Sequence, residues 1–173
     1  AELEAQYIRT FGHTMKQTYP AYEMEYDQGH VFMQSQSMAE LASFYRTFGA
    51  QAASGERLDH VATELEFMYF LTYKEAHAVT SDTGQGAEVC RDGQRRFLEK
   101  HLGRWAPPFL RGLMSGAEGF YRPLAKATRS WLDMEIKELE AHPRALGEDA
   151  LPDTSSPSLF DFGEDLSPCG DCE

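Results

Sequence analysis

Residues 59–78 decide the fold, and they read DHVATELEFMYFLTYKEAHA. The stretch contains neither Gly nor Pro, and its apolar residues follow the 3.6-residue period of an α-helix. One face consists of Val61, Leu65, Met68 and Thr72, widened by Phe67, Phe70 and Leu71. We therefore expect a central helix that is buried on most of its sides. Asp59 is a residue type that favours helix N-caps, so we expect it to cap a helix that begins at His60.

Helical patterns continue on both sides of this stretch, whereas the alternating runs of β-branched residues that would predict strands are nearly absent. The predicted helices cover residues 3–11, 37–48, 60–78, 87–102, 107–116 and 120–141. The sequence shows no internal repeat. It therefore predicts an all-α fold in which five or six helices pack as a single compact bundle.

Glycine, proline and polar residues mark the ends of several predicted helices. Ser37 and Glu40 form a capping box at the start of the second helix, and Gly49 is placed to end it. The segment WAPPF at residues 105–109 is expected to separate two helices, because proline is tolerated in the first turn of a helix but disrupts its interior. Pro143 is expected to end the last helix.

The negative charge of the chain is concentrated at its C-terminal end. Of the net charge of −12 over 173 residues, residues 143–173 carry −7 and residues 1–142 carry −5. We expect a helical domain over residues 1–142, followed by an acidic tail with four prolines and little structure of its own. The acidic composition argues against a nucleic-acid-binding protein and against stable association with anionic membranes.

Common motifs for catalysis or cofactor binding are absent from the sequence. There is no Gly-rich phosphate loop, nucleophile elbow or dinucleotide fingerprint, so no cofactor is expected. Cys169 and Cys172 form a C-x-x-C pair, but a structural zinc site needs four ligands, and a thioredoxin-like motif should follow a strand. We favour two exposed thiols in the tail. With no transmembrane run and no export signal, we expect a cytoplasmic protein.

His60 and Glu64 lie four residues apart and therefore share one face of the predicted helix. Such a pair can bind a metal ion or move a proton, so a metal-binding or catalytic helical protein is the alternative function. The zinc-protease pattern, however, needs a second His and a Glu beside the first. Because the sequence places no nucleophile or third ligand nearby, we favour hydrogen bonding of both side chains to their surroundings.

Residues 19–26 read YPAYEMEY and have no helical phase. Tyr supplies apolar area with a polar tip, and Met adapts to varied shapes, so these side chains suit the wall of a peptide groove. The two carboxylates would form an acidic rim for an arginine-bearing apolar peptide. A loop packed over the core is an equally good interpretation of the same residues.

Residues 56–68, ERLDHVATELEFM, resemble the pattern ERPDHxxxELxFM of TorD-like chaperones, the redox-enzyme maturation proteins of the TorD/DmsD/NarJ type. Leu58 stands where that pattern has Pro. Three further segments resemble family patterns in the same order, namely residues 3–12, 20–26 and 101–109. The resemblance covers residues 1–141, and we expect the chain to lack one or two helices that usually begin members of this family.

The resemblance implies an all-α, non-catalytic protein of the cytoplasm. Such a chaperone binds the twin-arginine leader, and often the body, of an apo molybdopterin-type oxidoreductase. It holds this client until cofactor insertion and folding are complete and then releases it for export. Family members include monomers and domain-swapped dimers, and both states are open for this chain. Some members are linked to guanine nucleotide or molybdenum cofactor, but no motif here supports either ligand.

The resemblance also directs the choice of candidate site residues. We expect the leader to contact Tyr22, Glu23, Tyr26, Glu56, Asp59, His60, Glu64, Phe67, Trp105 and Pro107. Carboxylates near the groove are expected to recognise leader arginines through bidentate hydrogen bonds. These carboxylates are Glu23, Glu25, Asp59, Glu64 and Glu66. Asp59 is expected to support the site as the helix cap, and His60 to lie at the groove.

Overall fold

The computed structural model describes residues 2–12, 19–26, 34–51, 55–81, 84–144 and 146. These residues form α1 (Glu2–Phe11), the 3₁₀ helix η1 (Glu23–Glu25), α2 (Gln34–Thr47), α3 (Val61–Thr80), α4 (Gly84–Lys100), α5 (Leu102–Gly116) and α6 (Tyr121–Glu138). The predicted all-α fold is confirmed. Within the described ranges, the β-type pairing is a single bridge between Tyr22 and His60. Most of the predicted tail, with Cys169 and Cys172, lies outside the described residues.

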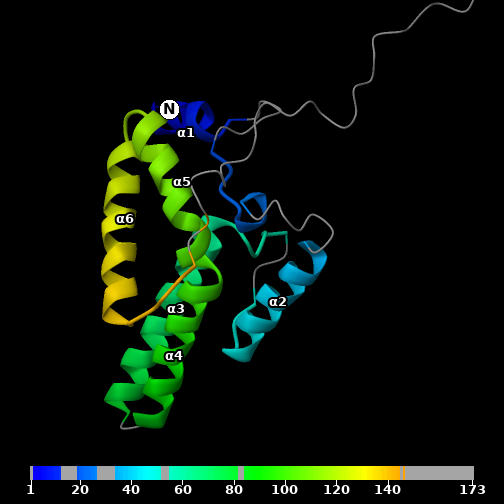
Figure 1. Ribbon diagram of the computed structural model, residues 1–173, viewed down its shortest axis with the longest axis vertical. Coiled ribbons are helices and arrows are strands. Elements are labelled where there is room, and N and C mark those ends of the chain that lie inside the picture. The colour runs from blue at the N-terminus through cyan, green and yellow to red at the C-terminus, as the bar shows by residue number, and fades with distance from the viewer. Residues whose placement is uncertain are drawn as a thin grey trace, which may run out of the picture.

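Two helical hairpins form the body of the molecule (Figure 1). The α3–α4 pair and the α5–α6 pair lie one above the other along the long axis, and α4 leads directly into α5. Helix α2 lies to one side, and α1 crosses the end of the α5–α6 pair. The N–H of Phe120 donates to the Gln6 side chain at 2.8 Å, which ties α1 to the start of α6. No helix in the described part of the chain is long and apolar enough to cross a membrane.

The core lies where the two hairpins meet. Phe67 of α3 packs against Tyr45 of α2 and Phe97 of α4, with ring centroids 4.3 and 4.9 Å apart. Trp105 of α5 is fully buried and packs against Tyr26 with a centroid separation of 5.4 Å. Aromatic pairs of this kind contribute about 0.5–1.5 kcal/mol each beyond their burial. They fix the segment after Pro20 against the helices that form the candidate site.

The start of α2 differs from its prediction. The helix begins at Gln34, so Ser37 and Glu40 lie inside it and the expected capping box is wrong. Glu40 instead accepts a hydrogen bond from the Gln36 side chain at 3.1 Å. The predicted end is correct, because Gly49 has a φ of 81°, the left-handed conformation that glycine adopts without strain.

Helix α5 runs through the segment that was expected to be a break. It begins at Leu102 and contains both Pro107 and Pro108, so the predicted interruption is wrong. A proline at 108 cannot donate to the carbonyl of Arg104, four residues earlier. The N–H of Leu146 takes this place and donates to that carbonyl at 3.0 Å. A chain segment from beyond α6 therefore satisfies the acceptor that the proline leaves free.

Helix α6 ends before Pro143, so the predicted role of that proline is wrong. The last helical residue is Glu138, and Glu140 has a φ of 50°. The N–H of Ala141 donates to the carbonyl of Ile136 at 2.9 Å, and the N–H of Glu140 donates to the carbonyl of Lys137 at 3.3 Å. These two bonds form a Schellman motif, which ends the helix without proline.

Candidate functional site

An apolar groove with a volume of about 280 Å³ opens between five parts of the chain. Its walls come from α1, residues 21–22, the start of α3, and the facing sides of α5 and α6. The lining residues are Tyr7, Phe11, Ala21, Tyr22, His60, Val61, Ala62, Leu65, Phe109, Leu110, Leu113, Tyr121, Leu124, Ala125 and Thr128. Helices α1 and α6 meet at one wall, where the rings of Phe11 and Tyr121 make an edge-to-face contact at 5.0 Å.

Large apolar side chains at the groove remain accessible to solvent. Tyr7 is 52% exposed and Leu124 is 44% exposed, and the nearby Ile8 is 54% exposed. Gathered apolar surface of this kind is typical of binding sites. Further along the seam between α3 and α6, a second hollow of about 500 Å³ shares Leu65 and Thr128 with the groove. Together the two hollows offer an elongated apolar surface suited to a peptide segment.

Residues 21–23 are held against the start of α3 by backbone hydrogen bonds. The N–H of Val61 donates to the carbonyl of Ala21, and the N–H of Glu23 donates to the carbonyl of Asp59, both at 2.9 Å. This pairing places the rings of Tyr22 and His60 next to each other, with centroids 5.1 Å apart. The two side chains thus form one polar edge of an otherwise apolar groove.

His60, and not Asp59, is the N-cap of α3. The N–H of Ala62 donates to Nδ1 of His60 at 3.2 Å, so the ring carries its proton on Nε2 when neutral. Burial lowers the pKa of His60, an effect that the charge of Asp59 opposes. The expected capping role of Asp59 is wrong because its carboxylate points away from the helix toward other partners.

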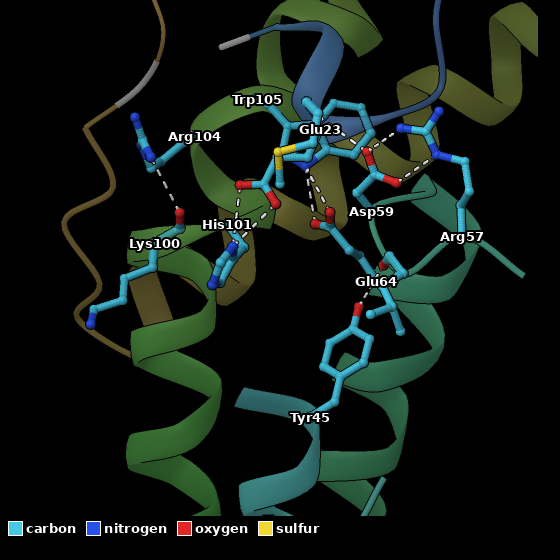
Figure 2. A network of polar contacts seen from close by, with 11 residues as sticks. Glu23, Tyr45, Arg57, Asp59, Glu64, Lys100, His101, Arg104 and Trp105 are labelled. Atoms are coloured by element: carbon cyan, nitrogen blue, oxygen red, sulfur yellow. Dashed lines mark hydrogen bonds and ion pairs between the residues drawn. The ribbon is translucent and has the colours of Figure 1, made fainter. Parts of the chain in front are cut away.

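The carboxylate of Asp59 is completely buried and binds Arg57. Nε and Nη2 of Arg57 donate to Oδ1 and Oδ2 at 2.9 and 2.7 Å, which makes the contact bidentate (Figure 2). The N–H of Met24 donates to Oδ2 at 3.4 Å. The guanidinium of Arg57 also lies 4.1 Å from the ring centroid of Tyr22. Its hydrogen bonds to Asp59 raise the pKa of Arg57.

Two more buried carboxylates lie beside Asp59, and each faces a partner of its own (Figure 2). Nε1 of Trp105 donates to both oxygens of Glu64, at 3.2 and 3.0 Å. Nδ1 of His101 lies 3.1 Å from Oε2 of Glu23. Burial raises the pKa of Glu64 well above its usual value, and the charge of Glu23 raises it further. This acidic cluster is therefore an internal network in which each carboxylate has a partner within the protein.

The structure divides the ten predicted leader-binding residues into three groups. Tyr22 and His60 line the groove. Glu23, Asp59 and Glu64 form the buried acidic cluster behind it. Of the rest, Tyr26, Phe67, Trp105 and Pro107 are buried in the core, and Glu56 is exposed. Of the other two carboxylates that were expected to bind arginine, Glu25 and Glu66 are both exposed, and neither lines the groove.

Most of the groove lining was missing from the sequence-based site. Tyr7 and Phe11 belong to the amphipathic pattern at residues 3–11, and Leu124 and Thr128 belong to the apolar stripe of α6. A stripe at helical spacing predicts a buried face but does not distinguish the core from an open groove. Arg57 could have been identified from the sequence, because it lies two residues before Asp59 in the motif at residues 56–68.

The alternative function, with His60 and Glu64 as a metal-binding or catalytic pair, is not favoured by the geometry. Glu64 has no exposed surface and accepts its hydrogen bonds from Trp105, while Nδ1 of His60 accepts from the helix backbone. Within the described ranges, no group of three or more His, Cys, Asp or Glu side chains is arranged to hold a metal ion.

Three curated relatives are similar to part of the chain. The selenate reductase assembly chaperone protein of Thauera selenatis is 39% identical over 116 residues, which cover 65% of this chain and 54% of the relative. The perchlorate reductase assembly chaperone protein of Dechloromonas aromatica (strain RCB) is 36% identical, covering 58% and 45%. The chlorate reductase assembly chaperone protein of Ideonella dechloratans is 40% identical, covering 42% and 37%. The match thus spans about half the length of these relatives or less.

No solved structure matches the chain significantly. A family model described as "Nitrate reductase delta subunit" matches residues 1–111, which include α1 through most of α5 and with them the acidic cluster and much of the groove. This match agrees with the TorD-like resemblance of residues 56–68. The chain therefore belongs to the nitrate reductase delta subunit family of TorD-like proteins.

Proposed function

We propose that the protein is a cytoplasmic assembly chaperone for the catalytic subunit of a molybdopterin-type oxidoreductase. It binds the twin-arginine leader of the apo subunit and holds that subunit while its cofactor is inserted. The observation that carries this proposal is the open apolar groove between α1, α3, α5 and α6. Family membership supports it, as do the names of the relatives, which are assembly chaperones for selenate, perchlorate and chlorate reductases.

The groove has the physical properties that reversible binding of a leader requires. A leader combines an apolar stretch with two arginines, and burying roughly 400 Å² of apolar surface contributes about 10 kcal/mol. Ordering the peptide and losing its translational freedom cost a similar amount, so binding stays reversible. A chaperone needs this balance because it must release its client after maturation.

The proposal assigns no chemical step to the chain. Glu23, Asp59 and Glu64 are all buried, and each is engaged with a side chain of the protein. Their role is to hold residues 22–26 against α3 and α5, and thereby to shape the polar edge of the groove. For Glu23 and Glu64 the role is structural and supports binding.

Calorimetric titration of a synthetic twin-arginine leader tests the proposal, with variants on one helix. Leu124→Glu places a charge in the groove, whereas Met134→Glu places one on the same helix, at a residue that is 59% exposed and does not line the groove. We expect Leu124→Glu to weaken leader binding at least tenfold, which corresponds to about 1.4 kcal/mol. Met134→Glu should bind the leader as the parent protein does.

Circular dichroism and thermal unfolding of both variants ensure that only binding is compared. Equal affinity of the two folded variants would show that the leader binds elsewhere. Absence of leader binding by the parent protein would remove the proposed function itself.

A further inference from the structure

The guanidinium of Arg57 is bound at the edge of the groove, between the carboxylate of Asp59 and the ring of Tyr22. Two of its nitrogens bind the two oxygens of Asp59 at 2.9 and 2.7 Å, and its Cζ lies 4.1 Å from the ring centroid of Tyr22. A buried carboxylate and an aromatic face together match the planar fork and the flat face of a guanidinium. Tyr22 also lines the apolar groove, so the site and the groove share a wall.

The ion pair is unusual in how its two partners are exposed. The side chain of Asp59 has no exposed surface, whereas 47% of the Arg57 side chain is exposed. The pairs that Arg91, Arg95, Arg96 and Arg129 form with carboxylates join partners that both remain accessible, as Arg129 and Asp133 do at 32% and 52%. Pairs of that kind contribute little. Arg57 thus lies on the solvent side of a buried acceptor, which is the side from which a ligand would approach.

The local backbone allows the Arg57 side chain to leave without disturbing a helix. Arg57 lies in the connection between α2 and α3, outside both helices. Its carbonyl accepts from the Thr63 hydroxyl at 3.1 Å and from the N–H of His60 at 3.4 Å. These bonds hold the backbone in place, so the side chain can rotate into solvent while Asp59 and Tyr22 keep their positions.

We propose that Asp59 and Tyr22 form an arginine-binding subsite that Arg57 fills in the free protein, and that an arginine of the bound leader displaces Arg57 from it. This inference rests on the proposed function and adds how the leader is recognised. One guanidinium replaces another, so the buried carboxylate is never left without a cation. That matters because an unpaired buried charge costs several kcal/mol.

Exchange explains how a buried acid can select arginine. Glu23 and Glu64 are paired with His101 and Trp105, whereas the partner of Asp59 is a solvent-accessible side chain of the same chemistry as the ligand. A lysine ammonium cannot form the bidentate contact and stack on the Tyr22 ring at the same time. The subsite therefore distinguishes a twin-arginine leader from a twin-lysine one without exposing a carboxylate to other cations.

Titration of the full-length protein with two leader peptides tests the exchange. One peptide carries the twin arginines and the other has both replaced by lysine. If Arg57 fills the subsite nine-tenths of the time, Arg57→Ala should bind the twin-arginine peptide about tenfold more tightly than the parent protein. Its affinity for the twin-lysine peptide should change far less. Arg95→Ala, which removes an α4 surface arginine paired with Asp92 and Glu99, serves as the control and should change neither affinity.

A second measurement needs no leader. Methylguanidinium should raise the melting temperature of Arg57→Ala and leave that of the parent protein unchanged, whereas methylammonium should stabilise neither. If Arg57→Ala does not fold, Arg57→Lys is used instead, because it keeps the positive charge but not the bidentate guanidinium geometry. Methylguanidinium should then stabilise Arg57→Lys.

The outcomes separate the two proposals. Failure of the parent protein to bind the twin-arginine leader rejects the proposed function, while rescue by methylguanidinium still measures the subsite. Leader binding that Arg57→Ala leaves unchanged or weakens rejects the exchange and makes Arg57 a fixed part of the wall. Absence of rescue by methylguanidinium in the substituted protein also rejects it.

Discussion

Glu64 is a carboxyl group without exposed surface, held by the indole N–H of Trp105. Burial and the charge of Glu23 raise its pKa, so the folded protein binds the proton of Glu64 more tightly than the unfolded chain does. Folding is therefore favoured while Glu64 is protonated. This advantage is lost as the pH rises from the ordinary value of 4.5 through the raised pKa of the folded state.

Glu64→Gln should remove this pH dependence, because an amide oxygen can still accept from Trp105 and carries no charge. The unfolding free energy of Glu64→Gln minus that of the parent protein should increase with pH, by at most about 1.4 kcal/mol per pH unit. Urea unfolding between pH 4.5 and 8 measures the difference. The exposed Glu66→Gln is the control, and a difference that does not vary with pH would contradict the assignment.

Titration of His60 affects stability in the opposite direction to that of Glu64, because the pKa of His60 is lowered whereas that of Glu64 is raised. Its Nδ1 accepts the N–H of Ala62, and its pKa is lowered by burial, so the neutral ring is the form that the folded protein prefers. The resulting stability is present above the ordinary value of 6.5 and is lost as the pH falls toward the lowered pKa.

His60→Asn should keep the cap and lose this dependence, since Asn is among the best N-cap residues. His60→Ala should lose the cap and about 1 kcal/mol of stability. Unfolding free energies of both variants at pH 5 and pH 8 provide the check. If His60→Asn were as sensitive to acid as the parent protein, another group would be responsible.

The cap of α3 also shows what a sequence pattern leaves open at the scale of one residue. Asp59 and His60 are adjacent, and Asp is statistically the stronger cap, so the pattern favoured Asp59. Arg57 decides otherwise, because it binds both oxygens of Asp59 and leaves His60 to accept from α3. The competition between two partners for one carboxylate depends on three-dimensional contacts that helix-cap preferences do not contain.

At the scale of the element, the ends of α6 and α5 depend on contacts of different range. The Schellman motif of α6 is local, yet it places Glu140 at a φ of 50°, where a non-glycine residue is strained. In α5 the carbonyl of Arg104 is satisfied by Leu146, more than forty residues later. The prolines alone therefore predicted a break in the helix, because no residue near Pro108 in the sequence indicates that the N–H of Leu146 will donate to this carbonyl.

Glu140→Gly should relieve the strain at the end of α6. Glycine adopts positive φ without a steric penalty, so we expect the unfolding free energy to rise by about 1 kcal/mol. Lys137→Gly, three residues earlier and inside the helix, should lower it by a similar amount. If Glu140 is the strained cap, chemical denaturation should show changes in unfolding free energy of opposite sign for the two variants. A loss of stability in both would show that the Glu140 side chain matters more than its backbone.

At the scale of the whole molecule, the groove exists because five segments converge on it. The pattern at residues 19–26 indicated Tyr22, and the motif at residues 56–68 indicated His60. Leu113 and Leu124 carry no comparable signal, because their apolar stripes look the same whether they face a core or an opening. The helical content could therefore be predicted from periodicity, whereas the groove required the packing of α1 and α6 against the rest.

The charge of the whole chain bears on how fast a cationic leader arrives. The net charge is −12, and the eight acidic residues within residues 147–173 contribute more than half of it. A negative field accelerates encounter with a ligand that carries two arginines, and salt screens this effect. If the leader binds in the groove as proposed, this field changes its dissociation rate little, because dissociation depends on short-range contacts.

Replacing these eight acids by Asn or Gln in the full-length chain should therefore slow leader association several-fold at low ionic strength and flatten its dependence on salt. Stopped-flow measurement of association and dissociation between 20 and 300 mM salt separates the two rates, and the dissociation rate should stay unchanged. Substitution of the exposed Glu25 alone, a single charge on η1, should change the association rate only slightly. Faster association after neutralisation would mean that the acidic segment competes with the leader for the groove, which is the opposite of steering.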